Sequence, residues 1–226
     1  MDSFKRNGPF IINLKNYIET AGDNTLRIVK DAERVSEKLD VEIIISPPQP
    51  SLALIAKQTK LKVISQHIDL KRHGATTGFY VAEIIEKVGA IGSLINHSEH
   101  GIKTEEIKQL IEKLKEINLL SFVCVKTVEE LKEILKFKPD FIAIEPPELI
   151  GTQKSISSEK PFLIQKSDEL IKQENYGSKL ICGAGINKGE DIRMAVENGA
   201  SGILVSSSIT RANNWYDKIF ELASAF

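Results

Sequence analysis

Residues 121–145 read SFVCVKTVEELKEILKFKPDFIAIE, two apolar runs on either side of a charged one. The outer runs, residues 121–125 and 141–145, are hydrophobic almost throughout, which is typical of strands buried on both faces. Between them, Thr127 and Glu130 stand at capping-box spacing, and Leu131, Ile134 and Leu135 follow at helical spacing. The segment therefore predicts a strand–helix–strand unit with parallel strands.

The same alternation continues along the rest of the chain, at the spacing of strand–helix–strand crossovers. Eight strands are predicted, over residues 10–14, 41–46, 62–66, 91–95, 121–125, 141–145, 179–182 and 202–206. Further amphipathic helices are predicted over residues 25–39, 104–117, 158–173, 187–197 and 214–224, with Asn187 as the N-cap of the fourth.

This pattern predicts the α/β class and a (β/α)8 barrel, in which eight parallel strands are each followed by a helix. No linker or shift in composition divides the chain, so we expect a single catalytic domain over residues 1–226. An open, doubly wound sheet is the alternative that the same alternation allows. A weak repeat favours the barrel, because GAIGSL at residues 89–94 resembles GASGIL at residues 199–204, and each leads into a predicted strand.

Composition narrows the classes of protein that fit. The 226 residues are 42% hydrophobic and 27% charged, which excludes a disordered chain, a collagen and a membrane protein. The formal net charge of −1 does not favour a nucleic-acid or membrane partner. Residues 1–6 lack the apolar core of a signal peptide, and the two cysteines are too few for a disulfide framework. We therefore expect a cytoplasmic protein.

Polar residues stand at the carboxyl ends of several predicted strands, where barrels of this kind place their active sites. Asn13 and Lys15 end the first strand, the run Asn96-His97-Ser98-Glu99 follows the fourth, and Glu145 ends the sixth. We expect these side chains to converge on one mouth of the barrel.

Each of these side chains has a chemical use and a plainer explanation. A carboxylate partly removed from water, such as Glu145, is a better general base near neutrality, although it could be a surface glutamate. His97 could polarise a carbonyl or serve as an ordinary structural histidine. An inward Lys15 needs an anion, and Glu99 could supply it unless the lysine is solvated.

The turns after the last two strands resemble phosphate-binding turns. Gly183-Ala184-Gly185 follows the seventh strand and Ser206-Ser207-Ser208 the eighth, where barrels often hold phosphate through main-chain N–H groups. The stiff pair Pro146-Pro147 and a long polar loop over residues 150–158 indicate a lid. Neither paired His or Cys spacing nor a dinucleotide or ATP motif is present, so no metal or cofactor is expected.

Together these segments resemble the triosephosphate isomerase family, in its compact archaeal-type form. The resemblance rests on NLK at residues 13–15, NHSE at 96–99, EPPELIGT at 145–152, CGAGI at 182–186 and the final serine turn. It covers the chain from the first strand to the last helix and implies the TIM-barrel fold. It also implies interconversion of dihydroxyacetone phosphate and D-glyceraldehyde 3-phosphate without metal or cofactor, in glycolysis and gluconeogenesis.

The resemblance further implies the roles of individual residues. Glu145 would be the base that moves a proton between two carbons, His97 the electrophile at the substrate oxygens, and Lys15 the cation that stabilises the enediolate. The substrate-binding residues would be Asn13, Lys15, Glu99, Ile150, Gly151, Gly185, Ser206 and Ser207. A small triose phosphate would be the partner, and the family implies a homodimer or homotetramer, with the compact form favouring the tetramer.

One residue departs from the family pattern. Gln153 stands where the family usually has glycine after Gly151-Thr152, and we expect altered lid kinetics if that position needs a positive φ angle. Two alternative functions remain open at this point: another phosphate-binding barrel enzyme acting on a sugar phosphate, and a non-catalytic sugar-phosphate-binding protein.

Overall fold

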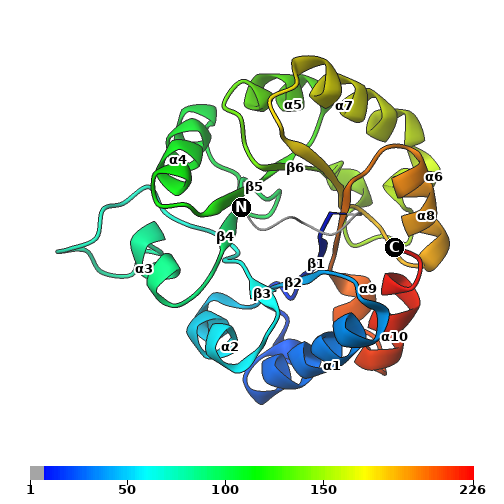
Figure 1. Cartoon of the computed structure of the whole chain (residues 1–226), viewed down its shortest axis with the longest axis horizontal. Coiled ribbons are helices and arrows are strands. Elements are labelled where there is room, and N and C mark those ends of the chain that lie inside the picture. The colour runs from blue at the N-terminus through cyan, green and yellow to red at the C-terminus, as the bar shows by residue number, and fades with distance from the viewer. Residues whose placement is uncertain (1–7) are drawn as a thin grey trace.

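A computed structural model describes residues 8–226, in which eight parallel strands form one curved sheet (Figure 1). The strands are β1 Phe10–Asn13, β2 Ile43–Ser46, β3 Lys62–Val63, β4 Gly92–Ile95, β5 Leu120–Val125, β6 Phe141–Ile144, β7 Lys179–Cys182 and β8 Gly202–Val205. Their order is β3-β2-β1-β8-β7-β6-β5-β4. The expectation for residues 1–6 concerns a segment outside the described residues.

The sheet closes into a barrel between β3 and β4. Ser65 pairs with Ser93 in a parallel bridge, and the Ser65 N–H donates to the Gly92 carbonyl at 2.9 Å. The (β/α)8 barrel is thus confirmed, and an open doubly wound sheet is excluded because such a sheet keeps two unpaired edges. Two more backbone hydrogen bonds support this closure, from the Ile91 N–H to the Val63 carbonyl at 2.8 Å and from the Leu94 N–H to the Ser65 carbonyl at 2.9 Å. β3 itself covers only residues 62–63 of the predicted 62–66.

Helices surround the barrel, and each strand is followed by at least one (Figure 1). They are α1 Asp23–Leu39, α2 Leu52–Gln58, α3 Ala82–Lys87, α4 Thr104–Glu116, α5 Val128–Leu135, α6 Ile156–Glu159, α7 Pro161–Glu174, α8 Gly189–Glu197, α9 Ser207–Thr210 and α10 Trp215–Ala223, with 3-10 turns η1 Ile18–Thr20, η2 Gln49–Ser51 and η3 Pro147–Leu149.

Capping explains where these helices begin. Thr127 caps α5 and accepts from the Glu130 N–H, as the sequence predicts. The helix predicted from residue 158 divides into α6 and α7 because Pro161 opens a new helix. The prediction that Asn187 caps α8 is wrong. Lys188 is the N-cap, and the Asp191 carboxylate accepts the N–H groups of both Asn187 and Lys188.

Two hydrophobic cores lie on opposite sides of the strands. The inner core fills the barrel and includes Ile11, Leu94 and Phe122, whose ring stacks on that of Phe141 with centroids 4.6 Å apart. The outer core packs the alternate strand residues against the helices. Side chains alternate along a strand, so every second residue of each strand points inward. This series reaches the mouth at Asn13, the last residue of β1, and at Glu145 and Ser206, the first residues after β6 and β8.

The sequence repeat marks two equivalent close approaches. A Cβ atom on Gly92, at the start of β4, would lie 2.3 Å from the Leu120 carbonyl oxygen. A Cβ atom on Gly202, at the start of β8, would lie 2.9 Å from the Pro9 carbonyl oxygen. The repeated glycine therefore lets the neighbouring backbone approach at both places.

Candidate active site

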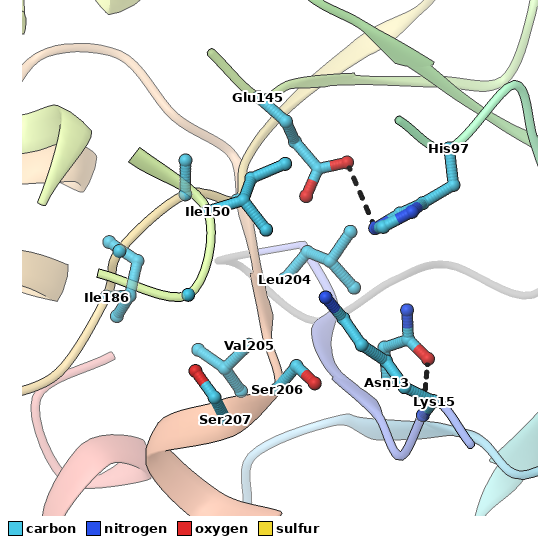
Figure 2. Close-up of a pocket in the computed structure, with 14 residues that line it drawn as sticks. Asn13, Lys15, His97, Glu145, Ile150, Ile186, Leu204, Val205, Ser206 and Ser207 are labelled. Atoms are coloured by element: carbon cyan, nitrogen blue, oxygen red, sulfur yellow. Dashed lines mark hydrogen bonds and ion pairs between the residues drawn. The ribbon is translucent and has the colours of Figure 1, made fainter. Parts of the chain in front are cut away.

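A narrow cavity of about 30 Å³ lies at the carboxyl ends of the strands (Figure 2). Its lining comprises Asn13, Lys15, His97, Glu145, Ile150, Gly151, Gly183, Ala184, Gly185, Ile186, Leu204, Val205, Ser206 and Ser207. A space of this size admits little more than a water molecule or two. A larger cavity of about 570 Å³ adjoins it and shares Asn13, Lys15 and His97 with it.

Glu145 is a buried carboxylate at the centre of this cavity. Its side chain follows Phe141 and Ala143 on the inward face of the strand, and the residue is 4% exposed. Burial raises the pKa of Glu145, opposed by the neighbouring His97 ring and by a hydrogen bond from the Cys124 thiol. Among the described residues, Oε2 has no hydrogen-bond partner. The geometry is that of a base with one oxygen left for a substrate proton.

Glycine at position 183 makes room for this carboxylate. A Cβ atom there would lie 3.0 Å from Glu145 Oε1 and 2.9 Å from the Leu204 Cβ. A side chain at this inward position would therefore displace the carboxylate or the wall of the cavity.

His97 is turned into the mouth by the residue before it. Asn96 adopts a left-handed conformation, with φ of 60°, and its side-chain amide donates to the Cys124 carbonyl and to Glu130, both at 3.0 Å. The Glu99 N–H donates to His97 Nδ1 at 3.2 Å, which requires a lone pair on that nitrogen. The imidazole is therefore neutral with its proton on Nε2, which lies 3.8 Å from Glu145 Oε2.

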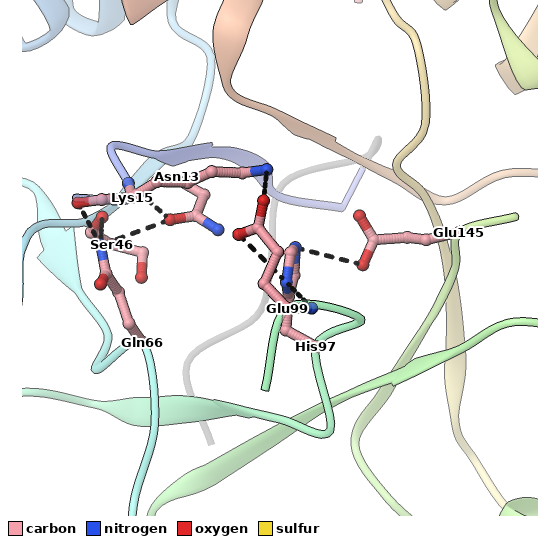
Figure 3. Close-up of polar contacts among 7 residues, drawn as sticks. All are labelled: Asn13, Lys15, Ser46, Gln66, His97, Glu99 and Glu145. Atoms are coloured by element: carbon pink, nitrogen blue, oxygen red, sulfur yellow. Dashed lines mark hydrogen bonds and ion pairs between the residues drawn. The ribbon is translucent and has the colours of Figure 1, made fainter. Parts of the chain in front are cut away.

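Lys15 also lies in a left-handed conformation, with φ of 48°. The Asn13 side chain accepts its N–H at 2.9 Å, and the Gln66 amide donates to its carbonyl at 3.0 Å. Its ammonium contacts Glu99 Oε1 at 2.6 Å, so Glu99 is the fixed acid that the sequence suggested (Figure 3). These contacts hold a strained backbone and aim a cation at the cavity.

The other end of the cavity is lined mainly by backbone. Gly185 has φ of 66°, and a Cβ atom there would lie 1.9 Å from the Lys154 carbonyl oxygen. Ser207 opens α9, whose first N–H groups have no partner within the helix. Figure 2 shows Ile150 and Ile186 on one side of this end and Ser206 and Ser207 on the other. The arrangement suits an anion bound through main-chain N–H groups.

A lid, defined here as residues 146–155, crosses the cavity beside Gly185. It begins with Pro146 and the short turn η3, and its Gly151 has φ of 72°. Gln153 is not among the residues with positive φ, so this conformation places no strain on the side chain that replaces the family's glycine. The expected change in lid kinetics stays a prediction.

The structure brings most of the predicted site residues together. Asn13, Lys15, His97, Glu145, Ile150, Gly151, Gly185, Ser206 and Ser207 all line the one cavity. Glu99 does not line it but lines the adjoining cavity of about 570 Å³, which Asn13, Lys15 and His97 also line.

Sequence reasoning missed three residues around this cluster. Cys124 reads as a core residue, yet its thiol donates to Glu145, and burial keeps the pKa of that thiol well above its ordinary value. Gln66 reads as the end of a strand, but its amide supports Lys15. Gly183 reads as part of a turn. The inward alternation along each strand was the signal available for all three, since Gln66 follows the inner-core residue Ile64 by two positions. The contact of Gln66 with Lys15 depends on a neighbouring strand and has no local signal.

Residues 8–226 contain neither a metal-binding cluster nor a membrane-spanning helix. No group of three or more His, Cys, Asp or Glu side chains in this range is arranged to hold a metal ion. In the same range, every helix is too short or too polar to span a membrane.

Known proteins match the chain over nearly its whole length. The family model described as Triosephosphate isomerase matches residues 9–223. The chain is 43% identical to the triosephosphate isomerase of Cenarchaeum symbiosum over 220 residues, which are 97% of this chain and 98% of that protein. It is 39% identical to that of Methanocaldococcus jannaschii and 38% identical to that of Methanothermus fervidus, each over 94% of this chain and at least 96% of the relative.

Proposed function

Because the chain belongs to the triosephosphate isomerase family, we propose that Glu145, His97 and Lys15 are its catalytic residues. The enzyme is an isomerase that interconverts dihydroxyacetone phosphate and D-glyceraldehyde 3-phosphate, a step of glycolysis and gluconeogenesis. The assignment of residues is carried by one observation, the buried Glu145 carboxylate that faces the protonated Nε2 of His97 across a cavity also reached by Lys15.

Glu145 would remove a proton from the carbon next to the substrate carbonyl. The bonding electrons move onto the carbonyl oxygen, so negative charge grows there as the enediolate forms. Glu145, now a carboxylic acid, returns the proton to the neighbouring carbon. Its raised pKa makes it a stronger base than an exposed glutamate, and its unpartnered oxygen is free for the transfer.

His97 and Lys15 would stabilise the oxygens at which this charge develops. A neutral imidazole donates its Nε2–H and, on losing that proton to one oxygen, recovers one from the other, which moves protons between the two oxygens. The Lys15 ammonium supplies a positive charge from a largely buried side chain, where it acts more strongly than in water. Glu99 contributes by holding Lys15 and by fixing the His97 tautomer through its own N–H.

We propose that the remaining substrate contacts divide between the two ends of the cavity. The Asn13 side chain would hold the substrate oxygens beside Lys15. Backbone at Ile150–Gly151, Gly185 and Ser206–Ser207 would hold the phosphate. The positive φ of Gly185 supports this, because only a residue without a Cβ atom can approach the lid so closely.

A coupled assay tests the function directly. The purified chain is expected to convert each triose phosphate into the other without added metal or cofactor. An enediolate mimic that carries a phosphate should bind about 10²-fold or more tightly than substrate, because the site complements the transition state. Turnover absent in both directions, or equal affinity for mimic and substrate, would contradict the proposal.

We further propose that the enzyme is a homo-oligomer, either a dimer or a tetramer. Residues 70–80 are all exposed and extend away from the barrel between β3 and α3 (Figure 1). They carry exposed Phe79 and Tyr80 close to the larger cavity, and Ile18 nearby is 83% exposed. Exposed apolar side chains of this kind favour a protein–protein contact. Sedimentation should give two or four times 25.1 kDa, and a fully active monomer would contradict this proposal.

We place the enzyme in the cytoplasm, as one catalytic domain over residues 1–226. Glycolysis supports this compartment, and so do Cys124 and Cys182, which are both free and buried.

A further inference from the structure

Asn187 lies just beyond the turn that follows β7, and its side chain reaches the lid. Its Nδ2 donates to the Thr152 carbonyl oxygen at 3.2 Å and to the Gly185 carbonyl oxygen at 2.6 Å. One of these oxygens belongs to the lid and the other to the turn proposed to bind phosphate. We propose that Asn187 is a positioning residue that holds the lid closed over the substrate, an inference that rests on the proposed function.

The backbone of Asn187 is held independently of this side chain. Its N–H donates to Asp191 Oδ2 at 2.9 Å, and its carbonyl accepts from the Lys218 ammonium at 2.7 Å. Asp191 is itself buried and receives the Lys188 N–H as well. The amide of Asn187 is therefore presented to the lid from a fixed position, and losing it leaves the start of α8 intact.

The hydrogen bond from Asn187 to Thr152 joins the middle of the lid, between its two anchored ends. The far end of the lid is already tied to the barrel, because the Ile156 N–H donates to the Ala184 carbonyl at 3.0 Å and the Ser158 hydroxyl reaches Asp191 at 3.4 Å. At the near end, Pro146 and Pro147 restrict the backbone. Asn187 bonds between these anchors, to Thr152, whose hydroxyl in turn donates to the Leu149 carbonyl and accepts the Lys154 N–H.

A single hydrogen bond suits a contact that must break in every turnover. Ile150 and Gly151 of the lid line the cavity, so a lid that opens for substrate to enter must break its contact with Asn187 and remake it on closing. One ordinary hydrogen bond is weak enough to be exchanged for water at each opening, yet strong enough to bias the lid toward the closed form.

Closure protects the intermediate from a competing reaction. In an open site the enediolate can expel its phosphate: the C–O bond breaks, its electron pair leaves with the phosphate, and the remaining neutral enol gains a proton at carbon and loses its hydroxyl proton to become methylglyoxal. A closed site opposes this loss. A lid held less firmly should therefore release more inorganic phosphate for each isomerisation.

The test compares Asn187→Ala and Asn187→Asp with the matched control Asn198→Ala. Asn198 also donates its side-chain amide to a backbone carbonyl, that of Met194 at 2.6 Å, but at the opposite end of α8. Asn187→Asp keeps the shape and removes the donor, which covers the case in which the alanine variant folds poorly. Hydrogen exchange of the lid amides is measured on the ligand-free chain, and phosphate release per isomerisation is measured during turnover.

Both Asn187 variants should speed lid exchange about three- to tenfold, the range that loss of one hydrogen bond implies. Phosphate release per isomerisation should rise by a similar factor and kcat/KM should fall, while Asn198→Ala changes neither. Unchanged lid exchange and unchanged phosphate release in well-folded Asn187 variants would overturn the proposal. A chain without isomerase activity would overturn the proposed function, and lid exchange would still decide the role of Asn187.

Discussion

Glu145→Gln is expected to lower kcat by about 10²–10⁴-fold, the range in which a positioned general base acts. The amide keeps the shape of the side chain but cannot accept a proton from carbon at neutral pH. Glu37→Gln is the matched control, because this carboxylate is exposed, pairs with Lys60 on the surface and lines neither cavity. The control should keep wild-type turnover in the coupled assay. A Glu145→Gln enzyme that did the same would remove Glu145 from the mechanism.

The folded state should tolerate this change. Burial raises the pKa of Glu145 above its ordinary value of 4.5, so the native state binds its proton more tightly than the unfolded chain does. That contribution to stability is present at low pH and is lost as the pH rises through the folded-state pKa. At neutral pH the ionised carboxylate therefore opposes folding, and the Tm of Glu145→Gln should be no lower than that of the wild type.

The raised pKa of Glu145 can be measured directly by NMR titration. The ¹³C carboxyl resonance that disappears in Glu145→Gln should titrate in the wild type with a midpoint above 4.5. A midpoint at or below that value would mean that His97, Cys124 and Lys15 outweigh desolvation. The exposed Glu148 carboxylate should titrate below its ordinary pKa, because Lys160 stabilises its charge.

Lys15→Met is expected to lower kcat by about 10²–10³-fold, as loss of one group that stabilises a developing oxyanion typically does. KM should rise as well, because the same ammonium attracts the doubly charged substrate. The loss has a second cause. Glu99 would be left without its cation, and its negative charge would face the substrate from behind the cavity.

Lys60→Met is the control for removal of a lysine. Lys60 pairs with Glu37 at 3.0 Å, but both side chains are exposed, so this pair contributes little. Its variant should match the wild type in kcat and KM. If Lys15→Met changed KM alone, Lys15 would serve binding without stabilising the transition state. If it changed neither constant, the assignment of Lys15 would be wrong.

Much of the site follows from local sequence because strand periodicity carries past the strand ends. The inward series of β6, Phe141 and Ala143, continues to Glu145, and that of β8 continues from Leu204 to Ser206. Asn13 follows Ile11 in the same way. Lys15 and His97 are different, since each reaches the cavity through a left-handed backbone at its own position or the one before it. Asn13 and Lys15 do share one cavity, as expected of residues at the end of one strand, but the backbone of Lys15 is left-handed, so alternation is not the reason.

The order of the strands and helices could be predicted from the amino-acid sequence alone, because the hydrophobic pattern of each element depends on residues only a few positions apart. The sequence also predicted which polar side chains stand at the carboxyl ends of the strands. Closure of the barrel through Ser65 and Ser93, support of Lys15 by Gln66, the Cys124 thiol on Glu145 and the contact of Asn187 with Thr152 depend on the tertiary structure. These partners are distant in sequence, 35 positions apart for Asn187 and Thr152, and only the curvature and stagger of the closed sheet bring them together.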